Sequence, residues 1–316
     1  MEKTLKRLLD FFDTVDENGI SNLDKVQKYQ KVLRRIETTD KSKSVEAVEN
    51  GTAAGGVPNG IIIENGKIIG LGIHIYNEDV YPLKSFEIYL RNCDLTGELD
   101  ISHCTDMVFL DLYHNRITSV RSKNLPSMRI FGVQDNRLER IDVSEMPSCQ
   151  GIDAGMNKLR NIDVSHNPEL VELYINDNDF VEIDLSHNPK LKYFYCHNNH
   201  IVELDTRSNP LLRHLNAAGN PMKSIRSLAP QREEKLPLEL YAGDGGWVGL
   251  KFNPVYNAQW KETGKWQQSY YAYPDNGFRF DGWYENGAKV SEEETWIDEY
   301  GTSRILKAVF EKDQNK

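Results

Sequence analysis

The chain has 316 residues, of which 39% are hydrophobic and 27% charged, and its formal net charge at pH 7 is −10. This length and composition predict a globular protein with two or three structural units. The acidic balance argues against an electrostatic nucleic-acid binder and against docking to anionic lipid, and no run of 18 apolar residues predicts membrane insertion.

The N-terminal segment, residues 1–36, carries apolar residues at helical spacing. They are Leu5, Leu8, Leu9 and Phe12, then Leu23, Val26, Tyr29, Leu33 and Ile36. The break at residues 16–19, Asp-Glu-Asn-Gly, predicts two helices, which either dock as a cap on the next domain or form a separate hairpin. Charged residues at 6, 7 and 10 interrupt the apolar run and favour an amphipathic helix over an export signal.

Two short segments precede the main repeat. Residues 37–59 are polar and glycine-rich and predict a linker. Residues 60–82 predict a capping β-hairpin, because Asn65-Gly66 suits a tight turn between two apolar runs. Such a hairpin would cover the open edge of the domain that follows.

A period of 21 residues dominates residues 83–228. One column of this repeat is asparagine: Asn115, Asn136, Asn157, Asn178, Asn199 and Asn220. Prolines keep the same spacing from Pro126 to Pro210, as do apolar residues such as Leu110, Phe131 and Ile152. The pattern predicts about seven coils of 21–22 residues that bury their apolar sides only by stacking, with a ladder of asparagines satisfying backbone groups inside the turn.

Residues 170–189, LVELYINDNDFVEIDLSHNP, resemble the leucine-rich repeats of bacterial proteins of the internalin kind. The resemblance covers nearly half of the chain. It implies an α/β-type solenoid, right-handed, with a parallel β-sheet on the concave side and a mostly irregular convex side.

The composition changes in residues 236–316, which hold all five tryptophans and alternate apolar and polar residues in the manner of β-strands. The run from Tyr271 to Val290, closing on residues 307–310, resembles the small β-rich B-repeat domain of internalins and its divergent relatives. That resemblance implies a small modular β domain of secreted or cell-surface proteins without catalytic residues. One copy is present, and no sorting motif follows it.

Binding residues are expected where strand side chains face the concave surface. The candidates are Tyr89, Phe109, Tyr113, Glu172, Tyr174, Tyr193, Tyr195, His197 and His214. Exposed tyrosines on a rigid sheet are typical of interaction hot spots, although aromatic residues also pack on one another along a sheet. Gly132, Gly151 and Gly155 should leave a shallow spot among these columns.

Nothing in the sequence indicates catalysis, a cofactor or a metal. No known catalytic motif is present, and the four cysteines fit neither a metal site nor a disulfide framework, so we expect them to be buried. His166 and His187 lie one coil apart with no third ligand, and the aspartates at 142, 163, 184 and 205 resemble a structural turn column rather than a calcium site.

The sequence therefore predicts a monomeric, non-enzymatic binding protein of the bacterial surface or secreted type, with a protein partner. The alternatives are an intracellular scaffold or delivered effector, and a carbohydrate-binding protein that uses the same tyrosines. The residues do not identify the partner, because recognition lies in the variable columns.

Overall fold

The computed structural model of the chain describes residues 7, 10–22, 24–25, 61–64, 67–71, 86–105, 107–228, 237–250, 268–298 and 304–313. These residues belong to two compact units, Met1–Leu159 and Arg160–Lys316, and each unit is described by itself. The expected linker at residues 37–59 and the part of the second expected helix beyond residue 25 lie outside the described residues.

The N-terminal segment of the first unit is helical at residues 10–13 and 24–25, on either side of a turn. Asn22 is fully buried, and its Nδ2 donates hydrogen bonds to the carbonyls of Phe11 (2.9 Å) and Thr96 (2.8 Å). The Thr96 backbone N–H in turn donates to Asn22 Oδ1 at 2.9 Å. The N-terminal segment is therefore docked against the coil that contains Thr96.

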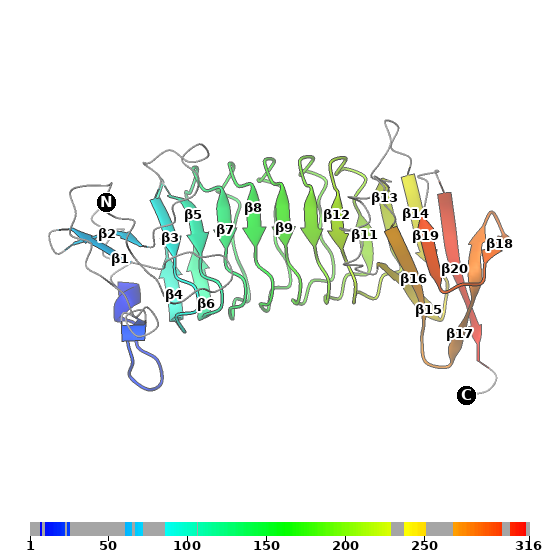
Figure 1. Cartoon of the computed structure of the whole chain (residues 1–316), viewed down its shortest axis with the longest axis horizontal. Helices are drawn as coiled ribbons and strands as arrows, with labels where there is room; N and C mark the ends of the chain where they lie inside the picture. The colour runs from blue at the N-terminus through cyan, green and yellow to red at the C-terminus, as the bar shows by residue number, and fades with distance from the viewer. Residues whose placement is uncertain are drawn as a thin grey trace, which may run out of the picture. The chain divides into compact units, whose positions relative to one another are not determined.

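The first unit contains a sheet with the strand order β1-β2-β3-β5-β7-β8 (Figure 1). The strands are β1 (Ile61–Glu64), β2 (Lys67–Leu71), β3 (Phe86–Tyr89), β5 (Met107–Asp111), β7 (Ile130–Gly132) and β8 (Gly151–Asp153). β1 and β2 form an antiparallel hairpin, and the other pairs are parallel. A second, two-stranded parallel sheet joins β4 (Thr96–Asp100) and β6 (Arg116–Arg121).

The second unit repeats the coil. Its parallel strands are β9 (Glu172–Tyr174), β10 (Tyr193–Tyr195) and β12 (His214–Asn216), paired in register with a step of 21 residues. On the return side, β11 (Glu203–Asp205) pairs in parallel with β13 (Ser224–Leu228). The expected solenoid with a parallel sheet is confirmed, and its return side, expected to be mostly irregular, carries these short strands.

In β5, β7, β8, β9 and β10, the residue at one shared strand position points into the core. Leu110, Phe131 and Ile152 in the first unit, and Leu173 and Phe194 in the second, are at most 1% exposed. Burying a side chain of this kind stabilises the fold by about 1.5–3 kcal/mol. Because the same position recurs in every coil, the stacked side chains form a continuous apolar column within each unit.

A left-handed residue lies three residues beyond the end of each of the strands β3, β5, β7, β8, β9, β10 and β12. It has φ between 53° and 69° in seven coils: Asn92, His114, Asp135, Met156, Asp177, Asn198 and Gly219. Asparagine, aspartate and glycine tolerate this conformation, whereas methionine does so at a cost, so Met156 departs from the pattern. The bend turns the next side chain, which is the ladder asparagine in six coils and Cys93 in the first, toward the interior.

The asparagine ladder makes the same hydrogen bonds in both units. In the second unit, Asn199 Nδ2 donates to the carbonyls of Ile175 (2.9 Å) and Cys196 (3.0 Å), and its Oδ1 accepts the N–H of Phe180 (3.0 Å). In the first unit, Asn157 Nδ2 donates to the carbonyl of Val133 at 3.0 Å, and its Oδ1 accepts the N–H of Leu138 at 3.0 Å. Each amide thus satisfies backbone groups of its own coil and of a neighbouring one.

The second unit has a further ladder at the return turn. Asn167, Asn188 and Asn209 are at most 2% exposed. Asn188 Nδ2 donates to the carbonyls of Val164 (2.9 Å) and Asn167 (3.0 Å), and Asn209 repeats the contacts one coil later. The first unit holds buried Cys104, Leu125 and Met146 at the same column. The sequence shows this column, but its hydrogen bonding emerges only in the structure.

The C-terminal region is a mixed β-sheet structure, as expected. Its strands are β14 (Pro237–Ala242), β15 (Gly246–Leu250), β16 (Gln268–Pro274), β17 (Phe278–Glu285), β18 (Ala288–Ser291), β19 (Thr295–Asp298) and β20 (Arg304–Lys312). They form a sheet β15-β16-β19 and complete a second sheet, β11-β13-β14-β20-β17-β18. The fully buried Trp283 contacts the rings of Phe280 and Trp296 in the core of this region.

This second sheet crosses the boundary that the sequence places between residues 228 and 236. β13 pairs antiparallel with β14 over five residues, and β14 pairs in parallel with β20. The N–H of Val248 also donates to the carbonyl of Met222 at 2.9 Å. The last coil is therefore joined to the C-terminal region by main-chain hydrogen bonds as well as by the chain itself.

All four cysteines are buried and none forms a disulfide. Burial raises the pKa of Cys104 to about 11 and that of Cys149 to about 12, and it also raises the pKa of Cys196. Thiols held in the neutral form behave as small apolar side chains rather than as nucleophiles.

Candidate functional site on the open sheet face

Strand residues that flank a buried one point to the opposite side of the sheet, which we call the open sheet face. It is the side on which the sequence predicts the binding residues. In-register parallel pairing stacks like positions of successive coils, so that Tyr193 lies beside Glu172 and His214, and Tyr195 lies beside Tyr174 and Asn216. The site residues are therefore positioned by the same hydrogen bonds that build the sheet.

Six of the expected binding residues lie together on the second unit. They are half-buried, and we call them the tyrosine–histidine patch: Glu172, Tyr174, Tyr193, Tyr195, His197 and His214.

The rings of the patch pack against one another. Tyr193 and His214 stack with centroids 4.8 Å apart and planes 5° from parallel. Tyr174 and Tyr195 lie 5.0 Å apart at 45°, and Tyr195 meets His197 edge-on at 6.5 Å. Because these contacts hold the rings in place, the patch is preorganised and would lose little side-chain entropy on binding.

Polar contacts fix the edges of the patch. The Tyr174 hydroxyl donates to Glu172 Oε2 at 3.2 Å, and Asn216 Nδ2 lies 3.0 Å from His197 Nδ1. Asn216 Oδ1 accepts the N–H of Ala218, which leaves its Nδ2 as the donor and His197 Nδ1 as the acceptor. The proton of the neutral ring then sits on Nε2, 3.6 Å from an Asp177 carboxylate oxygen.

Both histidines of the patch have lowered pKa values. Burial of the ring lowers the pKa of His197, although the nearby Asp177 carboxylate acts to raise it. The pKa of His214 is lowered mainly by burial and, to a smaller extent, by the positive charge of Arg213. Both rings are therefore mainly neutral at pH 7. Burial also raises the pKa of Tyr195, so its hydroxyl remains protonated.

The remaining expected binding residues belong to the first unit. Phe109 and Tyr113 lie half-buried on its open sheet face. The backbone of β3 is described, but the side chain of Tyr89 lies outside the described residues.

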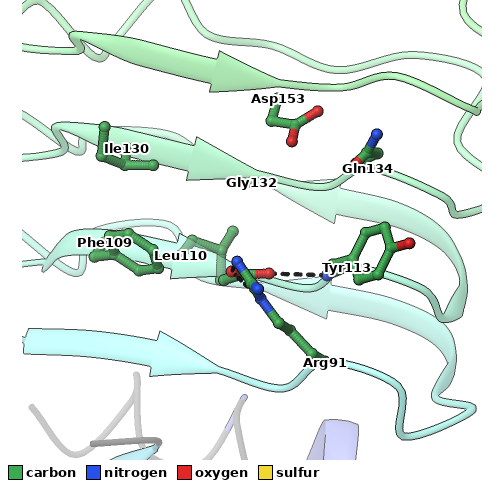
Figure 2. Close-up of a pocket in the computed structure, with 9 residues that line it drawn as sticks. Arg91, Phe109, Leu110, Tyr113, Ile130, Gly132, Gln134 and Asp153 are labelled. Carbon is green, nitrogen blue, oxygen red and sulfur yellow. Dashed lines mark hydrogen bonds and ion pairs between the residues drawn. The ribbon is translucent and has the colours of Figure 1, made fainter. Parts of the chain in front are cut away.

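A pocket of about 180 Å³ opens on this face of the first unit. We call it the Gly132 pocket, and nine residues line it: Arg91, Phe109, Leu110, Asp111, Tyr113, Ile130, Gly132, Gln134 and Asp153. Figure 2 shows Phe109 and Ile130 at one end, and Tyr113, Gln134 and Asp153 toward the other.

Glycine at position 132 makes room for this pocket. A Cβ there would lie 3.0 Å from the carbonyl oxygen of Leu110 and 3.6 Å from the Cα of Asp111. No side chain therefore rises from β7 between Asp111 on β5 and Asp153 on β8, which hold the same strand position.

An ion pair forms one wall of the pocket. The guanidinium of Arg91 pairs with the carboxylate of Asp111, whose residue is only 4% exposed. The N–H of Tyr113 donates to Asp111 Oδ1 at 3.1 Å, and the Arg91 guanidinium carbon lies 6.0 Å from the centre of the Tyr113 ring. Arg91 is thus held between two partners and has its charge neutralised.

Four polar residues of this pocket were not among the expected binding residues: Arg91, Asp111, Gln134 and Asp153. The sequence contains one signal for them, since glycine at 132 lies between two aspartates in a single column. The sequence analysis predicts aromatic binding residues instead, because aromatic residues are the usual members of binding hot spots.

The turn residues proposed as structural do make local hydrogen bonds. The N–H groups of Ser165 and Ser186 donate to Asp163 Oδ1 (2.9 Å) and Asp184 Oδ1 (2.8 Å). Bonds from the serine two residues later lower the pKa of both carboxyl groups. Within the described residues, no group of three or more His, Cys, Asp or Glu side chains is placed to hold a metal, and no helix is long and apolar enough to cross a membrane.

No protein-family model and no curated protein matches the chain. Solved structures do match. The functional domain of InlJ from Listeria monocytogenes is 20% identical with a TM-score of 0.34, over 38% of this chain and 31% of that one. The internalin InlF from the same species is 15% identical with a TM-score of 0.34, over 40% of this chain and 42% of that one.

YopM from Yersinia enterocolitica is 22% identical with a TM-score of 0.33, over 46% of this chain and 37% of that one. The chain thus spans less than half of each of these three structures. The likeness is one of repeat architecture, and it says nothing about what this chain binds.

Proposed function

We propose that this chain is a non-enzymatic binding protein that recognises a protein partner through its open sheet face. The observation that carries the proposal is the tyrosine–histidine patch, in which five aromatic or imidazole rings are packed, half-exposed and held by the sheet. Tyrosines of this kind dominate binding energy at protein interfaces.

The way in which the rings pack favours a protein over a sugar. Tyr193 stacks on His214, and Tyr174 packs against Tyr195 with the ring planes tilted, so these ring faces are already partly occupied inside the patch. A carbohydrate module offers open ring faces to the sugar, whereas a protein partner can pack against ring edges, hydroxyl groups and imidazole nitrogens. A glycan array that returned a patch-dependent ligand would reverse this preference.

A location at the bacterial surface or in the secreted fraction is part of the proposal. It rests on the sequence resemblances of residues 170–189 and 271–290, and the C-terminal β region would act as a spacer or second contact. The alternative is an intracellular scaffold or delivered effector. Cell fractionation with an antibody to the chain distinguishes them, since recovery from the cytosol alone would contradict the surface assignment.

The binding proposal is tested by comparing two baits in pull-downs analysed by mass spectrometry. One bait is the wild type, and the other carries Tyr174→Ala, Tyr193→Ala and Tyr195→Ala. We expect one captured protein to be lost with the variant, and its measured affinity to fall by about 30-fold or more, since a single hot-spot tyrosine contributes about 2 kcal/mol.

A control variant tests whether loss of the partner is specific to the tyrosines of the patch. The double variant Tyr241→Ala and Tyr284→Ala removes tyrosines of the C-terminal region, each of which donates to a carboxylate there. It should retain the partner, and circular dichroism should match for all baits. Capture of the same proteins by the wild type and the triple variant would contradict the proposal and assign the tyrosines to sheet packing.

A further inference from the structure

We propose that the Gly132 pocket receives an arginine or lysine side chain of the partner. This inference rests on the proposed function and specifies the chemistry of the partner at the open sheet face of the first unit. It assigns the first unit a recognition role of its own.

The dimensions of the pocket fit one side chain. Its volume of about 180 Å³ lies below the roughly 300–1,000 Å³ that is typical of small-molecule sites. Pockets of single-residue size on an interface are where anchoring residues insert, and arginine is enriched among such anchors.

The two ends of the pocket match the two parts of a long basic side chain. Phe109 and Ile130 offer an apolar wall for the methylene stem. At the other end, Gln134 and Asp153 offer oxygen acceptors, and the Tyr113 ring offers a π face, all of which suit a guanidinium or ammonium group.

The charges of the residues that line the pocket disfavour an anionic side chain or a phosphate. Arg91 is the only cation among the nine lining residues, and it is already paired with Asp111. With Asp153 added, the lining carries one positive and two negative charges, an excess of one negative charge. A carboxylate or phosphate would meet a guanidinium that is already paired and two carboxylates, whereas a cation would meet the carboxylate of Asp153 and leave the Arg91–Asp111 pair in place.

The test uses the full chain and four small probes, N-acetyl amides of arginine, lysine, citrulline and glutamate. Citrulline has nearly the shape of arginine without its charge. Binding is followed by two-dimensional NMR at the amides of Gly132, Gln134 and Asp153. We expect saturable shifts with the arginine or lysine amide and none with the citrulline or glutamate amide.

Two substitutions of opposite sign sharpen the result. Asp153→Asn should weaken binding of the cationic amide by about threefold, and Gln134→Glu should strengthen it by a similar factor, the range of one partly exposed charge pair. Glu139→Gln removes an exposed charge elsewhere in the first unit and should leave binding unchanged. Equal responses to the arginine and citrulline amides, a response to glutamate, or no response to any probe would overturn the proposal.

The outcome is separable from that of the proposed function. None of the three substituted tyrosines lines the Gly132 pocket, so we expect the triple variant to bind the arginine amide as the wild type does. Loss of partner capture without loss of amide binding supports both proposals. If the wild-type chain captures a partner through the tyrosines but binds neither cationic amide, this inference is wrong and the proposed function still stands.

Discussion

Residues 86–159 and residues 160–228 build the same coil with different buried residues. At the return turn the first segment stacks Cys104, Leu125 and Met146, whereas the second stacks Asn167, Asn188 and Asn209. The first uses packing of apolar atoms, and the second uses amide groups that satisfy carbonyls of the coil before. The comparison teaches that the coil geometry requires a filled column here but accepts two physical ways of filling it.

The exposed sides of the two segments differ as well. The first presents a pocket with polar and charged walls, and the second presents packed aromatic rings. The ends of the two units also differ. In the first unit the β1–β2 hairpin pairs with β3, and Asn22 of the N-terminal segment bonds to the backbone of Thr96, whereas in the second unit β13 pairs with β14. Three predictions test how far these differences matter, from the largest expected effect to the smallest.

The largest effect is expected at the asparagine ladder. Asn199 is 3% exposed, and Asn199→Ala would leave the N–H of Phe180 without its acceptor in a dry interior. It would also remove one of the two amide donors from each of the carbonyls of Ile175 and Cys196, which keep Asn178 and Asn220. We expect the free energy of unfolding to fall by about 4 kcal/mol, measured by urea denaturation.

The matching change in the first unit is Asn157→Ala. It breaks equivalent bonds, but this side chain is only half-buried, so water can replace part of what is lost. We expect a loss about 2 kcal/mol smaller. Equal losses at the two positions would show that exposure does not control the strength of the ladder.

A reciprocal exchange tests the return-turn column. Leu125→Asn places an amide in a fully buried apolar site and should cost about 3 kcal/mol. Asn188→Leu removes the amide donor to the carbonyls of Val164 and Asn167, each of which keeps one backbone N–H, and should cost about 2 kcal/mol. Chemical denaturation of both variants measures the two losses. If either change proved neutral, the column would be a passive filler rather than part of the fold.

The smallest effect concerns acid and the docking of the N-terminal segment. Hydrogen bonds from the N–H groups of Ile20 and Asn18, together with Lys25 at 3.0 Å, lower the pKa of Asp16 to about 2 from an ordinary value of 3.8. A carboxyl group with a depressed pKa stabilises the folded form above its unfolded pKa, and that contribution is lost as the pH falls. We expect the N-terminal segment to loosen between about pH 4 and pH 2.

Hydrogen exchange at Asn22 and Thr96 would measure this loosening, with the amides of β13 and β14 as the reference in the second unit. Asp16→Asn is the control, because it should raise exchange at neutral pH and remove most of the acid dependence. Unchanged protection of Asn22 at pH 2 in the wild type would show that the segment is held by its apolar residues and by Asn22 alone.

Much of the fold follows from the period alone. The core columns, the asparagine ladder and the strand positions recur every 21 residues because each buried position meets the same surroundings in every coil. The buried cysteines follow for the same reason, since each replaces a core residue at a known column. The tyrosine–histidine patch also follows, because in-register pairing stacks residues that the sequence already aligns.

Other features were decided by the tertiary structure. The Gly132 pocket depends on Arg91 reaching Asp111 across a coil boundary, and the pairing of β13 with β14 joins the last coil to a region that the composition sets apart. The docking of Asn22 on Thr96 joins residues far apart in sequence. The 21-residue period constrains only the residues that are buried in the same surroundings in every coil. The open sheet face and the ends of the repeat have no repeated surroundings. The contacts there depend on which side chains the folded chain brings together.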